Sequence, residues 1–520
     1  MVVLEEYYWI TVVGGIFGFI YAFGIGANDV ANAFASTVAA KSLTLKQAVL
    51  VASIFEFCGA YFLGASVTST IRNKIFSIDL YKEIPEIVLL GMMTSLATAS
   101  LMLLVATAFG APVSTTHTIV GCIMGFSISA KGFDSIEWPI IYKIFISWAA
   151  SPLISGAVAC AFFGSIRYFV LRSENAFNRA VLTFPIVLTL GIGIDLFFIL
   201  YKGLSNTKFK TAKVSIVLPI AFGVGAFCGL IWLVIVGPFI KKRIESKMAR
   251  EENDVAAAEE LEEGKVKTID GPDKDDEEAD DVAEQVVDSD GVQEETPVVG
   301  KRSIIQKFSD ATYGQDLKAQ SFHESEKAEL LWQDVEQFDK HAEELFSYIQ
   351  VFTACLNSFA HGANDVANAI APLSAIVFIY QTGTLKSKSP VQKWVLAYGG
   401  VGIVIGLLLY GYKVMKSLGY KLTPLSPSRG ACAELAASLF VVTASFLSIP
   451  VSSTQSIVGA VAGVGLAGGY RNVDWFFLFK VCLSWVFVFF SSVVLSAGLF
   501  SFVAFSPSLA TPLFTNRTAS

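Results

Sequence analysis

The sequence predicts an all-α polytopic membrane protein with about 12 transmembrane segments in two inverted repeats, and with re-entrant or broken helices at a central binding site. Three observations lead to this fold class. First, 53% of the 520 residues are hydrophobic and only 16% are charged, with a mean hydropathy of +0.58, whereas soluble domains carry about 25% charged residues. Second, the apolar residues lie in runs of about 20, the length that spans a bilayer. Third, two polar motifs occur twice in the same order.

The apolar runs give the expected segments in chain order. Seven precede a polar stretch and five follow it, near 9–38, 45–66, 86–110, 111–129, 139–164, 180–201 and 213–240, then 346–380, 392–411, 431–449, 450–469 and 474–505. The runs 111–129 and 450–469 are rich in Ser, Thr and Gly and begin at Pro112 and Pro450. Re-entrant segments are therefore an alternative to full crossings here, since non-helical backbone at membrane depth is tolerated only where protein or water covers it.

Charge divides the chain further. Residues 251–300 hold 20 of the 45 carboxylates and only three lysines, so this part cannot bury enough apolar surface to fold and we expect it to be disordered. Near the end of the same stretch, helical spacing of apolar residues predicts an amphipathic helix with Leu330, Leu331, Val335 and Phe338. The expected regions are an N-terminal membrane half 1–240, a cytoplasmic loop 241–345 that tethers or regulates the halves, a C-terminal membrane half 346–505 and an external tail 506–520.

Basic residues set the expected orientation. Five of them directly follow the seventh run: Lys241, Lys242, Arg243, Lys247 and Arg250. By the positive-inside rule the central loop is then cytoplasmic. Seven crossings before the loop and five after it put both termini outside, and we expect the plasma membrane. Glu5 and Glu6 stand where a secretory signal carries basic residues, so we expect the first run to be a retained helix.

Several classes of function are disfavoured. Outside the acidic segment the chain is only mildly basic, so nucleic-acid binding has no support. The seven cysteines lie in apolar segments without C-x-x-C spacing, which favours packing over a metal site or a disulfide framework. A G-x-x-x-x-G-K-[ST] loop is absent from the sequence, so ATP-driven pumping is not expected. We expect neither enzyme activity nor a cofactor.

An internal duplication is the strongest signal. Gly-Ala-Asn-Asp-Val-Ala-Asn occupies residues 26–32 and again 362–368, at a spacing of 336. Pro-Val-Ser-Thr-Thr-His-Thr-Ile-Val-Gly at 112–121 matches Pro-Val-Ser-Ser-Thr-Gln-Ser-Ile-Val-Gly at 450–459, at a spacing of 338. With seven crossings between them, the two copies of the first motif enter the membrane from opposite sides. Such inverted repeats are common in transporters, which bind substrate near the midplane at the repeat interface.

The first motif of each half carries a carboxylate at membrane depth, Asp29 in one half and Asp365 in the other. An intramembrane charge costs about 2.5–3.5 kcal/mol or more on insertion scales, so it is a functional candidate by default. Four flanking amides add oxygen ligands: Asn28, Asn32, Asn364 and Asn368. Carboxylate and amide oxygens are hard ligands that suit Na⁺, and neighbouring glycines make unwinding easy, which would expose backbone carbonyls as well.

The second motif of each half suits an anion. Proline fits the first turn of a helix, and hydroxyls with free N–H groups at a helix start bind anions, helped by the helix dipole. The hydroxyl residues are Ser114, Thr115, Thr116, Ser452, Ser453 and Thr454. Two such starts that meet at the midplane would hold one tetrahedral oxyanion without an arginine. Isolated Ser and Thr residues more often join helices, and the duplication is what favours a binding site.

Two further intramembrane carboxylates are Glu56 and Glu434. They are not at equivalent offsets in the two halves, so the repeat does not support them. Two roles are open for them: ion coupling, or pairing with Arg429 or a backbone group.

The histidines near the motifs lack symmetric partners. His117 has Gln455 as its counterpart in the second half, and His361 has Ile25 as its counterpart in the first. For His117 this favours a packing role over a proton relay, and the same caution applies to His361.

The paired motifs resemble those of the inorganic phosphate transporter family, the type III sodium–phosphate symporters. Other similar stretches are residues 44–72, Tyr-Gly-Gly-Val-Gly at 398–402 and Leu-Thr-Pro at 422–424. The resemblance covers both membrane halves and leaves out the central loop and the tail. It implies a symporter of inorganic phosphate, usually driven by Na⁺ and in some branches by H⁺, with an inverted-repeat fold.

The resemblance also implies roles for individual residues. Phosphate would contact Ser114, Thr115, Thr116, Ser452, Ser453, Thr454, Asn32, Asn368, Asp29 and Asp365. The Na⁺ ligands would be Asn28, Asp29, Asn364 and Asp365. The family glutamates associated with transport are matched by Glu56 and Glu434. Gln455 departs from the family pattern, where many members have His, and this mildly favours Na⁺ over H⁺.

Together these features predict a secondary-active symporter that imports inorganic phosphate with Na⁺ by alternating access. Its partners are phosphate, Na⁺ and the lipid bilayer, with a homodimer as one open assembly. Two rivals remain. One is an H⁺-coupled carrier of phosphate or sulfate, and the other is a non-transporting receptor or phosphate sensor, for which the long loop is the only support.

Overall fold

The computed structural model describes residues 5–203, 213–267, 326–333, 335–386 and 391–505, which are nearly all helical. Within these ranges no β-strand forms, and one isolated bridge joins Phe76 to Ile136. The all-α fold expected from the sequence is confirmed. Contacts divide the chain into two units, Met1–Pro238 with Asp316–Ser520, and Phe239–Gln315.

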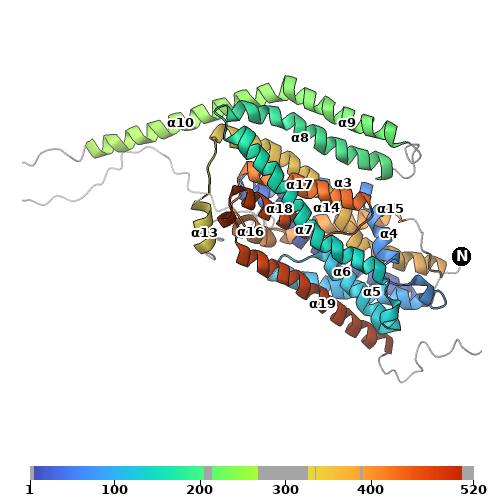
Figure 1. The fold of residues 1–520 in the computed structure, drawn as a ribbon. Coiled ribbons are helices and arrows are strands. Elements are labelled where there is room, and N and C mark those ends of the chain that lie inside the picture. Colours follow the sequence, from blue (N-terminus) through green and yellow to red (C-terminus); the bar gives the residue numbers. More distant parts are fainter. Residues whose placement is uncertain (1–4, 204–212, 268–325, 334, 387–390, 506–520) are drawn as a thin grey trace, which may run out of the picture. The chain divides into compact units, whose positions relative to one another are not determined.

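Helices of the first half follow the expected runs closely (Figure 1). They are α1 (Tyr8–Ile25), a π-helical segment (Gly26–Val30), α2 (Ala31–Ala39), α3 (Leu45–Leu63), α4 (Ala65–Asn73), α5 (Pro85–Ala108), α6 (Thr115–Lys131), α7 (Trp138–Ile166), α8 (Ala176–Phe198), α9 (Val214–Ile231) and α10 (Gly237–Lys267). A capping box at Thr44 and Gln47 begins α3, which satisfies two of the free N–H groups at that helix start.

The second half contains fewer and partly longer helices. They are α13 (Glu326–Gln333), α14 (Lys340–Thr382), α15 (Lys393–Tyr410), α16 (Tyr412–Lys421), α17 (Pro427–Phe446), α18 (Ser453–Gly468) and α19 (Trp475–Phe505). Asp339 is the N-cap of α14, since its carboxylate accepts the N–H of Ala342 at 2.8 Å.

Among the described residues, ten helices are long and apolar enough to cross a membrane. They correspond to ten of the twelve apolar runs. The other two runs, 111–129 and 450–469, form the shorter helices α6 and α18, of 17 and 16 residues. These are the two segments for which a re-entrant path was the alternative, and a helix of 16 residues rises only about 24 Å.

The polar stretch between the halves differs from the expectation. Helix α10 continues through Lys267, so its residues 251–267 are helical although the acidic segment was expected to be disordered. Three alanines, 256–258, lie between the acidic residues of this part, and alanine has the highest helix propensity. The rest of that segment, 268–325, lies outside the described residues.

Helix α13 ends before the apolar pattern does. Leu330 and Leu331 lie on α13, whereas Val335 and Phe338 follow it in a non-helical segment that leads to α14. The single amphipathic helix expected over these four residues is therefore wrong. The physical reason is Glu336, whose carboxylate accepts hydrogen bonds from Arg167 at 2.7 Å and Arg172 at 2.8 Å.

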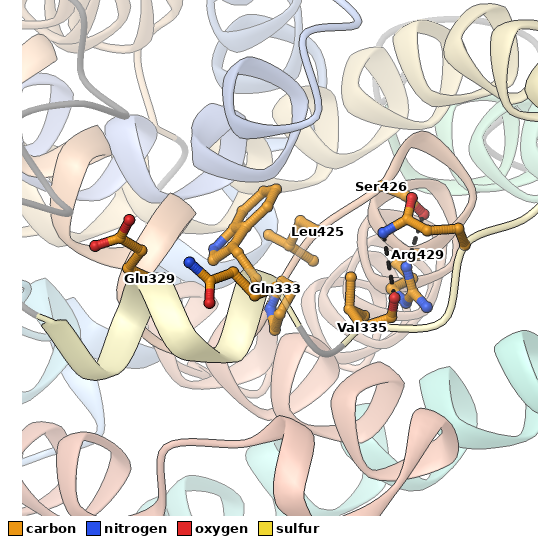
Figure 2. Close-up of a pocket in the computed structure, with 9 residues that line it drawn as sticks. Glu329, Gln333, Val335, Leu425, Ser426 and Arg429 are labelled. Carbon is orange, nitrogen blue, oxygen red and sulfur yellow. Dashed lines mark hydrogen bonds between the residues drawn. The ribbon is translucent and has the colours of Figure 1, made fainter.

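Charged residues fasten this segment to the membrane helices. Although partial burial raises the pKa of Glu336, hydrogen bonds from Arg172 and Arg167 lower it overall. Figure 2 shows Arg429 of α17 beside Ser426 and Val335, at a pocket between α13 and the start of α17. The Arg429 guanidinium donates to the Glu336 carbonyl at 2.9 Å. The polar stretch thus ends in a fixed contact with the second half.

Candidate functional site

The two cradle segments, defined here as Ser114–Thr116 and Ser452–Thr454, lie against each other. Thr116 Oγ1 donates to the Val451 carbonyl at 3.1 Å, and the side chains of His117 and Gln455 approach to 3.3 Å. All six cradle side chains are buried. The sequence expectation that two duplicated helix starts meet is therefore what the geometry shows.

Each cradle helix begins with a serine cap. The Ser114 hydroxyl accepts the N–H of His117 at 3.3 Å, and the Ser452 hydroxyl accepts the N–H of Gln455 at 3.3 Å. A cap satisfies only one of the four free N–H groups at a helix start. The remaining donors, together with the positive end of the helix dipole, can hold an anion between the two starts.

In the first half, Asn28 holds the connection that leads to α6. Its Nδ2 donates to the Ala111 carbonyl at 2.9 Å and to Thr107 Oγ1 at 3.2 Å. Its Oδ1 accepts the Val113 N–H at 3.1 Å. The chain between α5 and α6 is therefore fixed to the first motif.

The second half repeats this contact at equivalent positions. Asn364 Nδ2 donates to the Val451 carbonyl at 2.8 Å, and its Oδ1 accepts from Ser445 Oγ at 3.4 Å. Ser445 and Val451 stand 338 residues after Thr107 and Val113, the same spacing as the cradle motifs. Both amides were expected at a cation, and both are also engaged in holding their connections.

The two aspartates share one threonine at the centre of the site. Thr115 Oγ1 lies 2.6 Å from Asp29 Oδ2 and 3.4 Å from Asp365 Oδ1. Asn368 Nδ2 lies 2.8 Å from Asp365 Oδ1, 3.1 Å from Thr115 Oγ1 and 3.2 Å from Thr116 Oγ1. Residues from three helices and both halves therefore converge on one buried polar cluster.

A group of candidate cation ligands lies beside this cluster. Asp29, His361 and Asp365 are buried, and each offers one ligand atom within 4.8 Å of the others. His361 Nε2 and Asp365 Oδ2 lie 3.3 Å apart, yet neither atom makes a hydrogen bond to the described residues. Two buried carboxylates need a compensating charge, and their oxygens suit a hard cation.

Glu56 of α3 reaches the helix of the second motif. Its carboxylate accepts from Ser358 Oγ at 2.9 Å and lies 2.9 Å from His361 Nδ1. Arg429, the alternative partner considered from the sequence, donates instead to Ser426 and to the Glu336 carbonyl. His361 thus links Glu56 to Asp365 across one imidazole ring.

Glu434 of α17 is surrounded by polar donors from the two motif helices. Its Oε1 accepts from Ser36 at 2.7 Å, Thr37 at 2.6 Å and Gln350 at 3.1 Å, and its Oε2 accepts from Thr353 at 2.8 Å. Hydrogen bonds to a charged acceptor are about twice as strong as neutral ones. A buried carboxylate from each half therefore ties down a motif helix.

Some expected residues stand apart from this network. The side chain of Asn32 lies outside the part that the structure describes. Ser453 Oγ is buried and makes no hydrogen bond to the described residues. The His117 ring lies 2.6 Å from Ser114 Oγ and stacks on Trp148, which fits the packing role favoured for it.

Several residues that contact the site had weak or no signal in the sequence. His361 was noticed only because it precedes the second motif. Tyr21, whose hydroxyl donates to the Thr115 carbonyl at 2.7 Å, and Gln350, next to Glu434, had no signal. Both belong to long apolar helices, where a lone polar side chain is a usable signal only when its neighbours in space are known.

The fold and the site define a multi-pass membrane protein in which two duplicated, hydroxyl-rich helix starts meet and are buried. A sequence model described as the phosphate transporter family matches residues 25–496. The chain belongs to this family. Because the family consists of transporters, the expectation that the chain is not an enzyme is confirmed.

Individual relatives agree with the family match. The chain is 30% identical to a phosphate-repressible phosphate permease of Neurospora crassa, over 97% of this chain and 99% of that one. It is 29% identical to sodium-dependent phosphate transporter 1 of Mus musculus, over 94% and 95%. A solved structure titled "The sodium-dependent phosphate transporter" has a TM-score of 0.72 at 28% identity, over 96% of this chain and 100% of that one.

Proposed function

We propose that the protein imports inorganic phosphate together with Na⁺ by alternating access. The observation that carries this proposal is the shared cluster at Thr115, which touches both duplicated aspartates at the point where the cradle segments meet. The cradle would hold phosphate through Ser114–Thr116 and Ser452–Thr454, with Asn32 and Asn368 beside it. The name of the Mus musculus relative supports Na⁺ as the coupling ion.

Na⁺ and phosphate would bind cooperatively at this site. Asp29 and Asp365 repel an oxyanion brought into the cradle, because all of these charges are buried in a low dielectric. Na⁺ between the two carboxylates, near the amides of Asn28 and Asn364, would offset that repulsion. Each ligand then lowers the free-energy cost of binding the other, which is the coupling that symport requires.

The helix directions support two inverted repeats. Helix α18 runs along α7 in the same direction, since Gly459 lies against Pro152 and Gly463 against Gly156. Helix α7 begins where α6 ends, after the short turn at 133–137. The helices α6 and α18 therefore leave the cradle in opposite directions. This is the arrangement of an inverted duplication around a midplane site.

The connections before the cradle support re-entrant hairpins. Thr107 near the end of α5 contacts Asn28 in the middle of the first span, and Ser445 near the end of α17 contacts Asn364 in the middle of α14. We propose that α5–α6 and α17–α18 each enter and leave on one side. The full crossings are then α1, α3, α7, α8 and α9 before the loop, and α14, α15 and α19 after it.

Both sets of crossings are odd, so both termini lie opposite the central loop. We propose the orientation expected from Lys241 and its basic neighbours, with the loop 241–345 cytoplasmic and the termini outside, in the plasma membrane. The membrane halves 1–240 and 346–505 then each supply one motif pair. Cysteine labelling from either side at position 5 and at position 510 tests this topology.

The experiment for the function is uptake of labelled phosphate into proteoliposomes, with Na⁺ replaced by choline at fixed pH. We expect uptake to require Na⁺, and Asp29→Asn and Asp365→Asn to reduce it at least about a hundredfold, since buried charge contacts are worth several kcal/mol. Asp134→Asn, the same change at an exposed residue in the turn between α6 and α7, is the matched control. Full uptake by both site variants contradicts the proposal.

A second candidate is H⁺ coupling, favoured by the imidazole of His361 between Glu56 and Asp365. It predicts that uptake in choline persists and rises with an inward proton gradient. Competition of labelled phosphate uptake by unlabelled sulfate distinguishes phosphate from sulfate as the substrate. A sensor that does not transport predicts no flux in any condition.

A further inference from the structure

A large apolar groove lies beside the cradle. It encloses about 620 Å³, roughly four times the ~150 Å³ cavity that holds one benzene ring. Its walls are almost wholly apolar and come from the helices α6, α7, α18 and α19 and the turn after α6. Its residues include Phe133, Trp148, Val486 and Phe490.

The groove lies between two helix pairs, and within each pair glycines allow the two backbones to approach closely. In the pair α6–α19, a Cβ on Gly125 would lie 2.3 Å from the Val493 carbonyl oxygen. In the pair α7–α18, a Cβ on Gly463 would lie 2.1 Å from the Gly156 carbonyl oxygen. The helices of each pair are therefore in close backbone contact. The seam between the pairs, where the groove lies, is the looser contact and the place for relative motion of the two cradle helices.

The floor of the groove touches both cradle segments. His117 lines the groove, stacks on Trp148 at 3.5 Å between ring centroids and lies 2.6 Å from Ser114 Oγ. Gln455 also lines it, and its N–H is capped by Ser452. A change in the width of the groove therefore acts directly on the two serine caps.

The mouth of the groove faces the bilayer. Val486 and Phe490 are 53% and 62% exposed, and they lie on α19, a candidate membrane span. Around such a helix the solvent is hydrocarbon rather than water. Groove residues 482–493 of α19 extend about 17 Å at 1.5 Å per residue, close to the ~15 Å of one leaflet's hydrocarbon.

We propose that the acyl chain of a bilayer lipid occupies this groove and acts as an exchangeable wedge between the two helix pairs. The almost wholly apolar walls offer water few hydrogen-bond partners, and the acyl chains at the mouth are the apolar molecules at hand. In this structure the acyl chain keeps the pairs α6–α19 and α7–α18 apart, and it leaves the groove when the two pairs move together. This role rests on the proposed alternating-access function, but occupancy of the groove does not.

Occupancy is tested by photolabelling. The full-length protein is reconstituted in vesicles of phosphatidylcholine and phosphatidylglycerol, with a trace of phosphatidylcholine that carries a diazirine at the middle of one chain. We expect label on the groove segments of α7 and α19. Val486→Trp fills the groove and should reduce this label about fivefold or more, because a filled pocket excludes its ligand. Val494→Trp is the matched control on the same helix outside the groove.

Equal label in Val486→Trp and Val494→Trp, or a protein–protein crosslink in place of lipid label, overturns the occupant. The wedge is tested in the same vesicles. A fixed Trp cannot leave when the seam closes, so Val486→Trp should lower the maximal phosphate uptake rate about fivefold with little change in KM, as expected for a conformational step. Ala149→Phe, from the opposite wall, should do the same. Unchanged maximal rates in both variants overturn the wedge and leave the label result intact.

Discussion

Two identical stretches of seven residues take different backbone forms in this protein. Residues 26–32 contain the π-helical segment Gly26–Val30, which interrupts the helix between α1 and α2. Residues 362–368 lie inside the uninterrupted α-helix α14. Since the seven side chains are the same, their surroundings decide the difference. A π-helical turn inside an α-helix often marks a functional site, and here it marks only one of the two copies.

The copies also differ in how their aspartates are held. Asp29 receives the Thr115 hydroxyl from the cradle segment of its own half. Asp365 has Ser453 at the equivalent position, and that hydroxyl makes no hydrogen bond to the described residues. The connections held by Asn28 and Asn364, in contrast, involve residues at equivalent positions, although the amide atoms that make the bonds differ. The duplication therefore provides a similar scaffold around an asymmetric site.

The largest effect is expected from substitutions that disrupt a close helix contact present at both copies of the motif. A Cβ on Gly26 would lie 1.8 Å from the Ile403 carbonyl oxygen, and one on Gly362 would lie 2.2 Å from the Glu56 carbonyl oxygen. Overpacking costs about 1–3 kcal/mol and more where backbone must move. We therefore expect Gly26→Ala and Gly362→Ala to remove most folded protein from the membrane, measured by yield and thermal unfolding after extraction.

Gly15→Ala is the control for this pair, because nothing lies within 4 Å of the position of its Cβ. It should unfold at the same temperature as the unmodified protein. Wild-type stability of either Gly26→Ala or Gly362→Ala would mean that the close helix contact at that copy is not needed.

The next prediction compares the equivalent hydroxyl residues of the two cradle segments. Thr115→Val removes the hydroxyl between Asp29 and Asp365, and we expect phosphate uptake to fall by about 10- to 100-fold, since a hydrogen bond to a charged group is worth about 1.5–3 kcal/mol. Ser453→Ala removes a hydroxyl without a described partner. It should raise the KM for phosphate about tenfold and leave the unfolding temperature unchanged. An unchanged KM for phosphate in Ser453→Ala would contradict the proposal that Ser453 binds phosphate.

The sequence predicted the scaffold well for a physical reason. Apolar runs, prolines at helix starts and repeated motifs are local signals, and bilayer thickness converts run length into spanning helices. The meeting of Ser114–Thr116 with Ser452–Thr454 also followed, because a duplication implies equivalent positions in space. Of the twelve apolar runs, 111–129 and 450–469 are the two whose helices, α6 and α18, are not candidate spans among the described residues.

What could not be predicted depends on contacts between distant segments. The π-helical form of one motif and the α-helical form of the other cannot be derived from identical residues. The four donors around Glu434 come from α2 and α14, and none has a local signature. Helix α13 ends before the apolar pattern does because Glu336 forms hydrogen bonds with two arginines that follow α7, Arg167 and Arg172. Each case is a tertiary contact that overrides local preference.

A smaller effect, similar in both halves, is expected when the first asparagine of each Gly-Ala-Asn-Asp-Val-Ala-Asn motif is replaced. Asn28→Ala and Asn364→Ala each leave buried groups of a connection unpaired, which costs about 1–3 kcal/mol. Both should lower the unfolding temperature by a similar amount. Asn175→Ala, at the start of α8 away from both motifs, is the control. A clear loss in only one of the two variants would show that the repeated contacts are not equivalent in energy.

The smallest effect concerns the one residue at which the cradle motifs differ most. His117→Gln gives the first half the residue that stands in the second half. The backbone N–H that Ser114 caps remains. The stacking on Trp148, worth about 0.5–1.5 kcal/mol, is lost, together with the contacts of the ring with Ser114 Oγ and Gln455. Uptake should stay within about twofold of wild type with an unchanged pH profile, because Gln455 already serves the equivalent position without a titrating ring. A tenfold loss, or a pH profile that shifts, would make His117 a proton carrier and would place the asymmetry of the site in its ion coupling rather than in its packing.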